Sequence, residues 1–171
     1  MLSKRSHIIF LLGILLILAA CAPIAAPLPD LSGSTPPPDV AFTTPDGETV
    51  QLSDYKGKVL FVNFWGTYCP PCLDEMPDLQ AAYEKLAADD FVILGVNVEE
   101  SPEKVTSWTQ ENGITFPIAI SDDGTINPVL ALHRMPTTWF IDADGILRGK
   151  IEGQMSAQLI ERVARILLEE E

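Results

Sequence analysis

Two cysteines separated by two prolines, Cys69 and Cys72, are the residues of this chain best suited to chemistry. Thiols at this spacing can close a small disulfide ring and open it again. A strand-like apolar run, residues 58–65, precedes the pair, and a helix-like run, residues 73–88, follows it. At a helix N-terminus, unpaired N–H groups and the positive end of the helix dipole favour the thiolate, which is the reactive form of cysteine. The pair therefore predicts thiol–disulfide exchange.

Two other roles fit the same cysteine spacing less well. A zinc site normally needs four ligands, and after residue 20 the chain adds only His133 and Cys21 to the pair. A permanent structural disulfide would close a very small loop, and short loops contribute least to stability. Redox chemistry is therefore preferred, and no metal or other cofactor is expected.

The N-terminus has the layout of a secretory signal peptide. A short segment with Lys4 and Arg5 precedes an almost wholly apolar run, residues 8–20, which is shorter than the roughly 20 residues of a membrane-spanning helix. The tetrad at residues 18–21, Leu-Ala-Ala-Cys, resembles the lipobox of bacterial lipoproteins. This resemblance implies cleavage before Cys21 and acylation of that cysteine. In the alternative, an ordinary signal peptide, Cys21 is incidental.

The chain is strongly acidic. It has 11 basic and 24 acidic residues, and removal of residues 1–20 would change its net charge from −13 to −15 because Lys4 and Arg5 are lost. This charge argues against nucleic acid as a partner and against electrostatic docking on anionic lipid. Attachment to a membrane would therefore depend on acyl chains. The protein is expected outside the cytoplasm, anchored to the cell membrane by lipid at Cys21.

Composition divides the chain into three parts. Residues 1–20 are the expected signal peptide. Residues 21–38 hold six of the 14 prolines, which predicts a semi-rigid, extended linker. Residues 39–171 have the length of one domain with its own core.

Strands and helices alternate within residues 39–171. A Pro-Asp-Gly turn at residues 45–47 predicts a hairpin, and the later pattern predicts strand–helix–strand crossovers followed by a second hairpin and a helix. The fold class is therefore α/β, with a mixed central sheet, helices on both faces and an N-terminal β-hairpin. The predicted strands are 41–42, 49–52, 59–64, 91–98, 116–120, 138–141 and 146–151, and the predicted helices are 73–88, 101–112, 128–132 and 156–170.

Three separate motifs together resemble a known family. Residues 64–72 (Phe-Trp-Gly-Thr-Tyr-Cys-Pro-Pro-Cys), Pro77 and residues 135–138 (Met-Pro-Thr-Thr) resemble the thioredoxin superfamily. Within it, the chain is most similar to the membrane-tethered TlpA/ResA-like thiol–disulfide oxidoreductases, which are often grouped with the alkyl hydroperoxide reductase and thiol-specific antioxidant (AhpC/TSA) domains. The resemblance covers residues 39–171 and implies a thioredoxin-like three-layer fold.

The resemblance implies catalytic roles for three residues. Cys69 would be the attacking sulfur, and Cys72 the resolving sulfur that attacks the mixed disulfide and frees the product. Glu75 follows Cys72 by three residues on roughly the same helical face, where the family has a glutamate thought to move protons. Asn63 replaces the superfamily's buried aspartate and cannot titrate, which favours Glu75 as the proton-handling group. In the alternative, Glu75 only interacts with the helix dipole.

The resemblance also implies a substrate site. Pro136 matches the superfamily's cis-proline, which lies against the dithiol, so the Met135 backbone would pair with an extended substrate segment. Trp65, Tyr68 and Met135 would supply an apolar rim. The alternative is that these side chains are packed in the core. Tyr68 departs from the more usual tryptophan, which leaves fine substrate preference open.

The predicted function is a monomeric, extracytoplasmic, membrane-anchored thiol–disulfide oxidoreductase. It would reduce protein disulfides, for example in cytochrome c maturation or redox homeostasis, and receive electrons from an upstream membrane or extracytoplasmic donor. The sequence leaves the direction open, since potentials of related dithiols span about −270 to −120 mV. One alternative is a thiol-dependent peroxidase, although the Pro-x-x-x-Thr/Ser-x-x-Cys loop of peroxiredoxins is absent. Another is a non-enzymatic lipoprotein with an inert disulfide.

Overall fold

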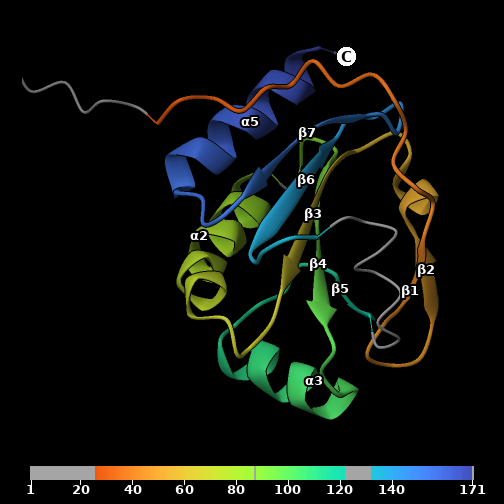
Figure 1. Cartoon of the computed structure of the whole chain (residues 1–171), viewed down its shortest axis with the longest axis vertical. Helices are drawn as coiled ribbons and strands as arrows, with labels where there is room; N and C mark the ends of the chain where they lie inside the picture. The colour runs from red at the N-terminus through yellow and green to blue at the C-terminus, as the bar shows by residue number, and fades with distance from the viewer. Residues whose placement is uncertain (1–25, 87, 122–131, 171) are drawn as a thin grey trace, which may run out of the picture.

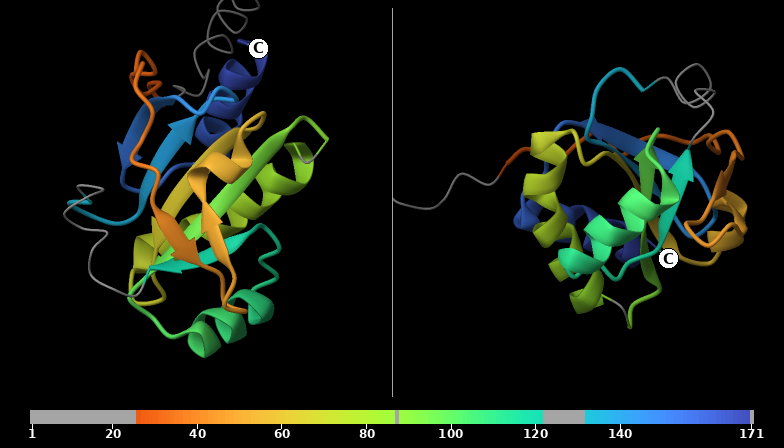
Figure 2. Two further views of the ribbon diagram at one scale, coloured as in Figure 1. Left: turned by 90° about the vertical axis from the view of Figure 1, so that its right-hand side faces the viewer. Right: turned by 90° about the horizontal axis from the view of Figure 1, so that it is seen from below.

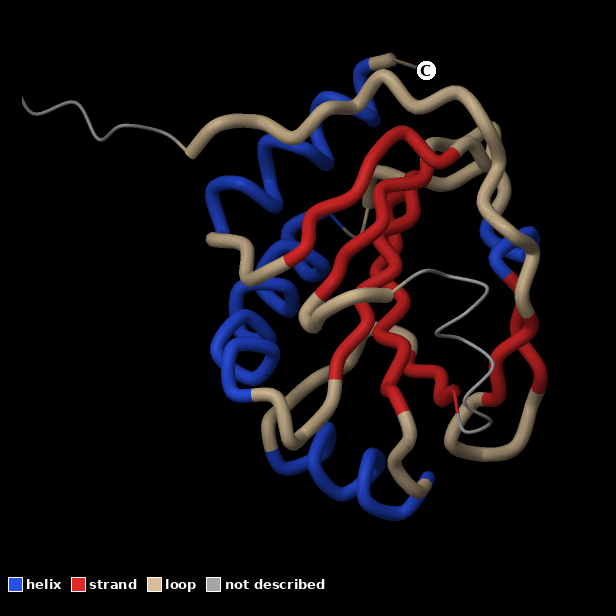
Figure 3. The backbone as a smooth tube through the Cα atoms, viewed as in Figure 1, coloured by secondary structure: helices blue, strands red, loops and turns tan. Residues whose placement is uncertain are grey.

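A seven-stranded mixed sheet forms the centre of the computed structural model, which describes residues 26–86, 88–121 and 132–170 (Figures 1 and 3). The strand order is β2-β1-β5-β4-β3-β6-β7. The strands are β1 (Ala41–Thr43), β2 (Thr49–Gln51), β3 (Val59–Trp65), β4 (Phe91–Val98), β5 (Ile118–Ser121), β6 (Thr137–Ile141) and β7 (Leu147–Glu152). The helices are the 3-10 helix η1 (Leu52–Tyr55), α2 (Pro70–Leu86), α3 (Pro102–Glu111) and α5 (Ala157–Glu169).

The strand directions confirm the predicted mixed sheet and N-terminal hairpin. Strands β3, β4 and β5 run parallel. Strand β6 pairs antiparallel with β3, and β7 pairs antiparallel with β6. The β1–β2 hairpin joins the sheet through an antiparallel pairing of β1 with β5. Every residue of β3 is buried, as its continuous apolar run predicts for a strand covered on both faces. This central strand ends immediately before the loop that leads to Cys69.

Two core clusters lie on opposite faces of the sheet. Helices α2 and α5 cover one face together (Figure 1), and the core there includes Phe61, Leu79 and Ile160. On the other face, η1 and the β1–β2 hairpin contribute Leu52 and Phe42 to the second cluster. The brief helix predicted at residues 128–132 lies almost wholly outside the described residues. Burial of apolar side chains on both faces is the main stabilising contribution to such a domain.

The starts of α2 and β5 differ most from the prediction, whereas the other elements start within one residue of it. Helix α2 begins at Pro70 rather than at residue 73, because proline lacks an N–H group and the first helical positions need no donor. Strand β5 begins at Ile118 rather than at residue 116. Phe116 is instead a buried core side chain. The helix therefore starts directly after Cys69.

Part of the predicted linker is docked on the domain. Residues 26–35, which we call the N-terminal strap, run along β7 and across α5 (Figures 1 and 2). The Gly33 N–H donates to the Arg148 carbonyl over 2.8 Å, and the Leu147 N–H donates to the Thr35 carbonyl over 3.0 Å. The Arg148 Nε donates to the Leu31 carbonyl over 3.2 Å. This part of the expected spacer is therefore fixed by backbone partners that its composition does not reveal.

Candidate active site

The cysteine pair lies where β3 passes into α2. Cys69 and Cys72 form a disulfide, with Cys69 directly before the first residue of the helix. The Cys69 carbonyl accepts the N–H groups of Cys72 and Leu73 over 3.0 and 3.2 Å, so it begins the helical hydrogen-bond ladder. Cys69 keeps 8 % of its surface exposed, whereas Cys72 is 0 % exposed. Cys69 is thus the more accessible sulfur.

Glu75 lies one helical turn beyond Cys72 and is buried. The Asn63 Nδ2 donates to its Oε1 over 2.7 Å, and the Met155 N–H donates to its Oε2 over 2.9 Å. Burial raises the pKa of this carboxyl from 4.5 to about 7, although both hydrogen bonds act in the opposite direction. Such a group can hold or release a proton near neutral pH.

Asn63 joins Glu75 to β6. Its Nδ2 also contacts the Thr138 Oγ1 over 2.9 Å, so one buried amide connects β3, α2 and β6. From the sequence, Asn63 and Glu75 were linked only by function, because an asparagine at position 63 leaves Glu75 as the proton-handling group. The hydrogen bond between them was not predicted. Thr138 and Met155 carry no sequence signal for this contact, because their places depend on how β6 and the segment before α5 pack.

The expected substrate residues do not all lie at the surface. The Met135–Pro136 peptide bond is cis, which agrees with what the family resemblance implies for Pro136. The register that pairs Phe64 with Thr137 places Pro136 beside the end of β3, where the loop to Cys69 begins. Met135 is half-buried, and Tyr68 is 54 % exposed. These two side chains are therefore accessible for contact with a partner.

Trp65 does not belong to an exposed rim. It is 0 % exposed and packs against Trp108, with ring centroids 5.1 Å apart. The prediction of Trp65 as a surface contact is therefore wrong for this state, because the last residue of β3 points into the core beneath α2. Cys21, the expected lipidation site, lies outside the described residues.

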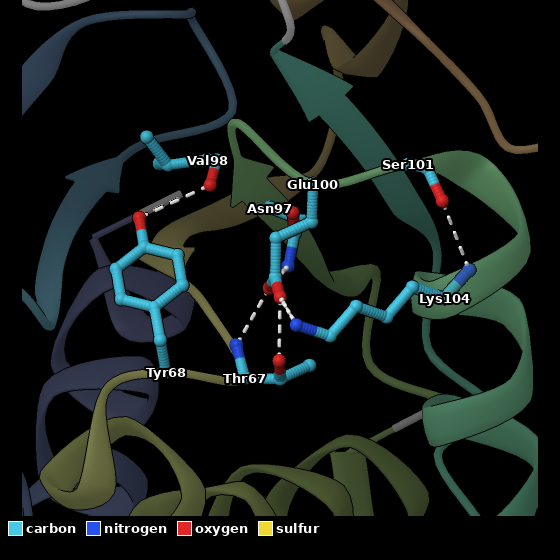
Figure 4. A network of polar contacts seen from close by, with 7 residues as sticks. All are labelled: Thr67, Tyr68, Asn97, Val98, Glu100, Ser101 and Lys104. Atoms are coloured by element: carbon cyan, nitrogen blue, oxygen red, sulfur yellow. Dashed lines mark hydrogen bonds and ion pairs between the residues drawn. The ribbon is translucent and has the colours of Figure 1, made fainter.

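A second buried carboxylate, Glu100, contacts the loop before Cys69 (Figure 4). Its partners are Thr67, Asn97 and Lys104. Sequence reasoning missed this group. The available signal was Asn97, a polar residue near the end of the otherwise apolar β4 run, because a buried amide needs hydrogen-bond partners.

Comparison with known proteins agrees with this geometry. The profile of the AhpC/TSA family matches residues 34–150. The chain belongs to the AhpC/TSA family. It is 39 % identical over 130 residues to the thiol-disulfide oxidoreductase ResA of Geobacillus kaustophilus, covering 76 % of this chain and 74 % of that protein. Against ResA of Bacillus subtilis it is 30 % identical over 166 residues, covering 93 % and 92 %.

A solved structure shows the same fold. The thioredoxin-family thiol:disulfide interchange protein from Chlorobium tepidum superposes with a TM-score of 0.70 at 30 % identity, covering 84 % of this chain and 99 % of that one. This member of the AhpC/TSA family is therefore a thiol–disulfide oxidoreductase of ResA type with a thioredoxin-like fold. The predicted family, fold class and enzyme class are confirmed.

Proposed function

We propose that this oxidoreductase reduces disulfides of proteins outside the cytoplasm. The observation that carries the proposal is the Cys69–Cys72 disulfide at the start of α2, with the buried Glu75 carboxyl one turn further along the same helix. The disulfide is the oxidised product of such a reaction, and Glu75 is a group able to accept the proton that resolution releases.

The reaction proceeds through a mixed disulfide. In the reduced protein, the Cys69 thiolate attacks one sulfur of a substrate disulfide, and the other substrate sulfur leaves as a thiolate that takes a proton from water. Cys72 then gives its proton to Glu75, directly or through one water, and attacks the Cys69 sulfur. The Cys69–Cys72 bond forms, the second substrate sulfur leaves, and two electrons have passed to the substrate. An upstream dithiol donor restores the reduced pair.

The substrate is proposed to lie across Tyr68 and the Met135–Pro136 bond. Tyr68 offers an exposed ring next to Cys69, and Met135 precedes β6 beside the end of β3. An extended peptide at this place could pair with the Met135 backbone as an added strand. Proteins with exposed cysteine pairs fit this site. Apocytochrome c before haem attachment and misoxidised exported proteins are the proposed substrates.

A turnover assay tests the reaction class. With dithiothreitol as donor, the wild-type protein should accelerate precipitation of reduced insulin, and hydrogen peroxide should be consumed no faster than in the donor control. Faster peroxide consumption without insulin reduction would instead assign a peroxidase. A protein inactive in both reactions would support the inert lipoprotein. An oxidised Cys-x-x-Cys-His peptide, compared with insulin, tests the apocytochrome preference.

Anchoring by lipid at Cys21 is the second part of the proposal. It is supported by the signal-peptide layout of residues 1–20 and the lipobox-like tetrad that ends at Cys21. None of the helices in the described ranges is long and apolar enough to cross a membrane. Cys21→Ser should therefore abolish metabolic labelling with palmitate and release the protein from the membrane fraction, while purified protein keeps its insulin activity. Retention of that variant in the membrane fraction would refute acylation as the anchor.

A further inference from the structure

The loop between β3 and α2 sets where Cys69 stands. It consists of Gly66, Thr67, Tyr68 and Cys69, and the Cys69 N–H donates back across it to the Gly66 carbonyl over 3.1 Å. A four-residue loop of this kind has few internal contacts to hold it. Its position therefore depends on what it touches outside itself.

Glu100 is what Thr67 touches. The Thr67 N–H donates to Glu100 Oε2 over 2.6 Å, and the Thr67 hydroxyl donates to Oε1. The Asn97 Nδ2 donates to Oε2 over 2.8 Å, and the Lys104 Nζ pairs with Oε1 at 2.6 Å. Each carboxylate oxygen thus takes one contact from the loop and one from the scaffold (Figure 4).

The scaffold side of this contact comes from a strand and a helix. Asn97 is a fully buried residue of β4, and Lys104 stands in the first turn of α3. Between them, Glu99 adopts the left-handed conformation with φ of 64°, which L residues rarely occupy. That turn directs the Glu100 side chain toward Thr67 rather than toward solvent.

The carboxylate is charged at every pH of interest. Burial alone would raise its pKa, but the hydrogen bonds from Asn97, Lys104 and Thr67 outweigh burial and hold the pKa at about 2. The Glu100 carboxylate lies at most about 11 Å from the Cys69 Cα, since it accepts the Thr67 N–H and one residue, Tyr68, lies between Thr67 and Cys69. A unit charge at that distance changes the equilibrium constant between thiol and thiolate severalfold.

Tyr68 adds a second tie to the same segment. Its hydroxyl donates to the Val98 carbonyl over 3.1 Å (Figure 4). Its ring lies over Gly66 so closely that a Cβ there would stand 2.7 Å from the Cε1 atom. Two consecutive loop residues are thus held by residues 97–104.

We propose that Glu100 is a positioning residue for Cys69. By clamping Thr67 to β4 and α3, it holds the attacking sulfur in place, and its charge, partly balanced by Lys104, sets the reduction potential of the dithiol. The inference rests on the thiol–disulfide activity proposed above and adds a residue with no contact to the sulfurs.

Three variants separate position from charge. In Glu100→Gln one oxygen becomes an NH2 group, which faces either the Thr67 N–H and the Asn97 amide or the Lys104 ammonium, so in each orientation the clamp loses a contact to a donor. The kcat for insulin reduction should fall about tenfold with KM within about twofold, since buried Glu100 does not meet the substrate. Thr67→Val removes only the hydroxyl tie and should lower kcat about threefold without moving the glutathione equilibrium.

The equilibrium with glutathione reports the charge. Glu100→Gln removes a negative charge, so it should favour the reduced, thiolate-containing form about threefold. This corresponds to a reduction potential about 14 mV less negative. Lys104→Gln removes the balancing positive charge and should shift the equilibrium the opposite way. Glu103→Gln, an exposed neighbour on the same helix, is the matched control and should behave as wild type.

A purely structural role for Glu100 predicts different results. Glu100→Gln would then lower only the unfolding temperature, with kcat and the glutathione equilibrium within twofold of wild type, and that outcome would overturn the inference. If Glu100→Gln does not fold, Thr67→Val with unchanged kcat and Lys104→Gln with an unchanged equilibrium would overturn it equally. Failure of the wild-type protein to reduce insulin would count against the proposed function instead, because the glutathione equilibrium needs no protein substrate.

Discussion

Two buried carboxyl groups near the dithiol have opposite properties. Glu100 receives a lysine and three other hydrogen bonds, and its pKa is about 2. Glu75 receives only the Asn63 amide and the Met155 N–H, and its pKa is about 7. Surroundings that push two carboxyl pKa values apart assign different tasks to them. Glu100 is a fixed charge, whereas Glu75 can exchange a proton during each redox cycle.

Asn63 is suited to either protonation state of Glu75. Its Nδ2 donates to the ionised carboxylate. Its Oδ1 is buried and accepts no hydrogen bond from any described residue. Rotation of the amide would present that oxygen to a protonated Glu75, while Thr138 could donate or accept in turn. Asn63 can thus keep a hydrogen bond to Glu75 in both protonation states without itself titrating.

The pKa of Glu75 predicts how stability depends on pH. Its folded pKa of about 7 lies above the ordinary 4.5, so between these values the folded protein holds a proton that the unfolded chain has released. The contribution of Glu75 to the free energy of unfolding should therefore be full at pH 4.5 and be lost as pH rises through 7, by roughly 3 kcal/mol. Urea unfolding of the oxidised protein at pH 4.5, 6 and 8 measures this.

Glu75→Gln should remove the fall in the free energy of unfolding between pH 4.5 and 7. It should also slow resolution of the mixed disulfide and change the pH dependence of that step. Asp74→Asn, an exposed neighbour, should keep both wild-type properties. Stopped-flow reduction across pH 5–9 checks the kinetics. If the Glu75→Gln protein keeps the wild-type pH dependence of stability and the wild-type kinetics, Glu75 has no role in proton transfer.

The difference in exposure between the two cysteines predicts which one forms the mixed disulfide. Cys72 is fully buried, whereas Cys69 is not. Cys72→Ser should therefore accumulate mixed disulfides through Cys69, visible on non-reducing gels, while Cys69→Ser should trap at least about tenfold less. Equal trapping by both variants would contradict the assignment of Cys69 as the attacking sulfur.

Among the elements, β7 depends on the strap that covers its outer edge. Gly149 lies so close to it that an added Cβ would stand 2.2 Å from the Asp30 carbonyl oxygen. Its φ is not in the left-handed region, so alanine is tolerated by β7 itself and the clash falls on the strap. Without the strap, the edge of β7 would be exposed, and exposed sheet edges pair readily with other chains.

Gly149→Ala should displace the strap and leave the active site intact. We expect faster hydrogen exchange at the Gly33 and Leu147 amides and a loss of about 1–2 kcal/mol, since two or three hydrogen bonds are lost. Lys150→Ala, a change at the next, exposed residue, is the control. Unchanged exchange in Gly149→Ala would show that the strap is not held by this contact.

Periodic patterns predicted most elements, and close packing accounts for the differences. The apolar runs at β3 and β4 and the cap-and-proline start of α3 gave nearly the observed bounds. The strap was missed because its contacts depend on Gly33 and Gly149 coming together from distant parts of the chain. Composition indicates that the strap has few apolar side chains to bury. It does not indicate that the strap lies beside the edge strand β7.

The site was predicted where its chemistry is local. The cysteine pair and the cis bond before Pro136 follow from short motifs that resemble a family. Trp65 was misplaced because alternation cannot tell a strand end that points inward from one at the surface. Glu100 was missed because its contacts come from the loop before Cys69, from β4 and from α3. The packing of these three segments leaves no pattern in the sequence.

For the whole molecule, the strap adds residues 26–35 to the folded unit predicted to begin at residue 39. A chain that begins at Asp39 should be less stable in urea than one that begins at Ala26, by about 1–3 kcal/mol, because it lacks the bonds to β7 and the Arg162 contact with the Ala26 carbonyl. Insulin reduction should be the same in both. Equal midpoints would show that the strap adds no stability.

The strap also governs how far the enzyme can travel from an anchor. With the chain fixed to α5 at Ala26, only four residues separate it from the proposed acylated Cys21, a reach of about 18 Å at most. A domain tethered over so short a distance would stay within a thin layer above the bilayer. Donors and substrates held in the same layer would meet it at high effective concentration, and freely diffusing ones would gain no such advantage.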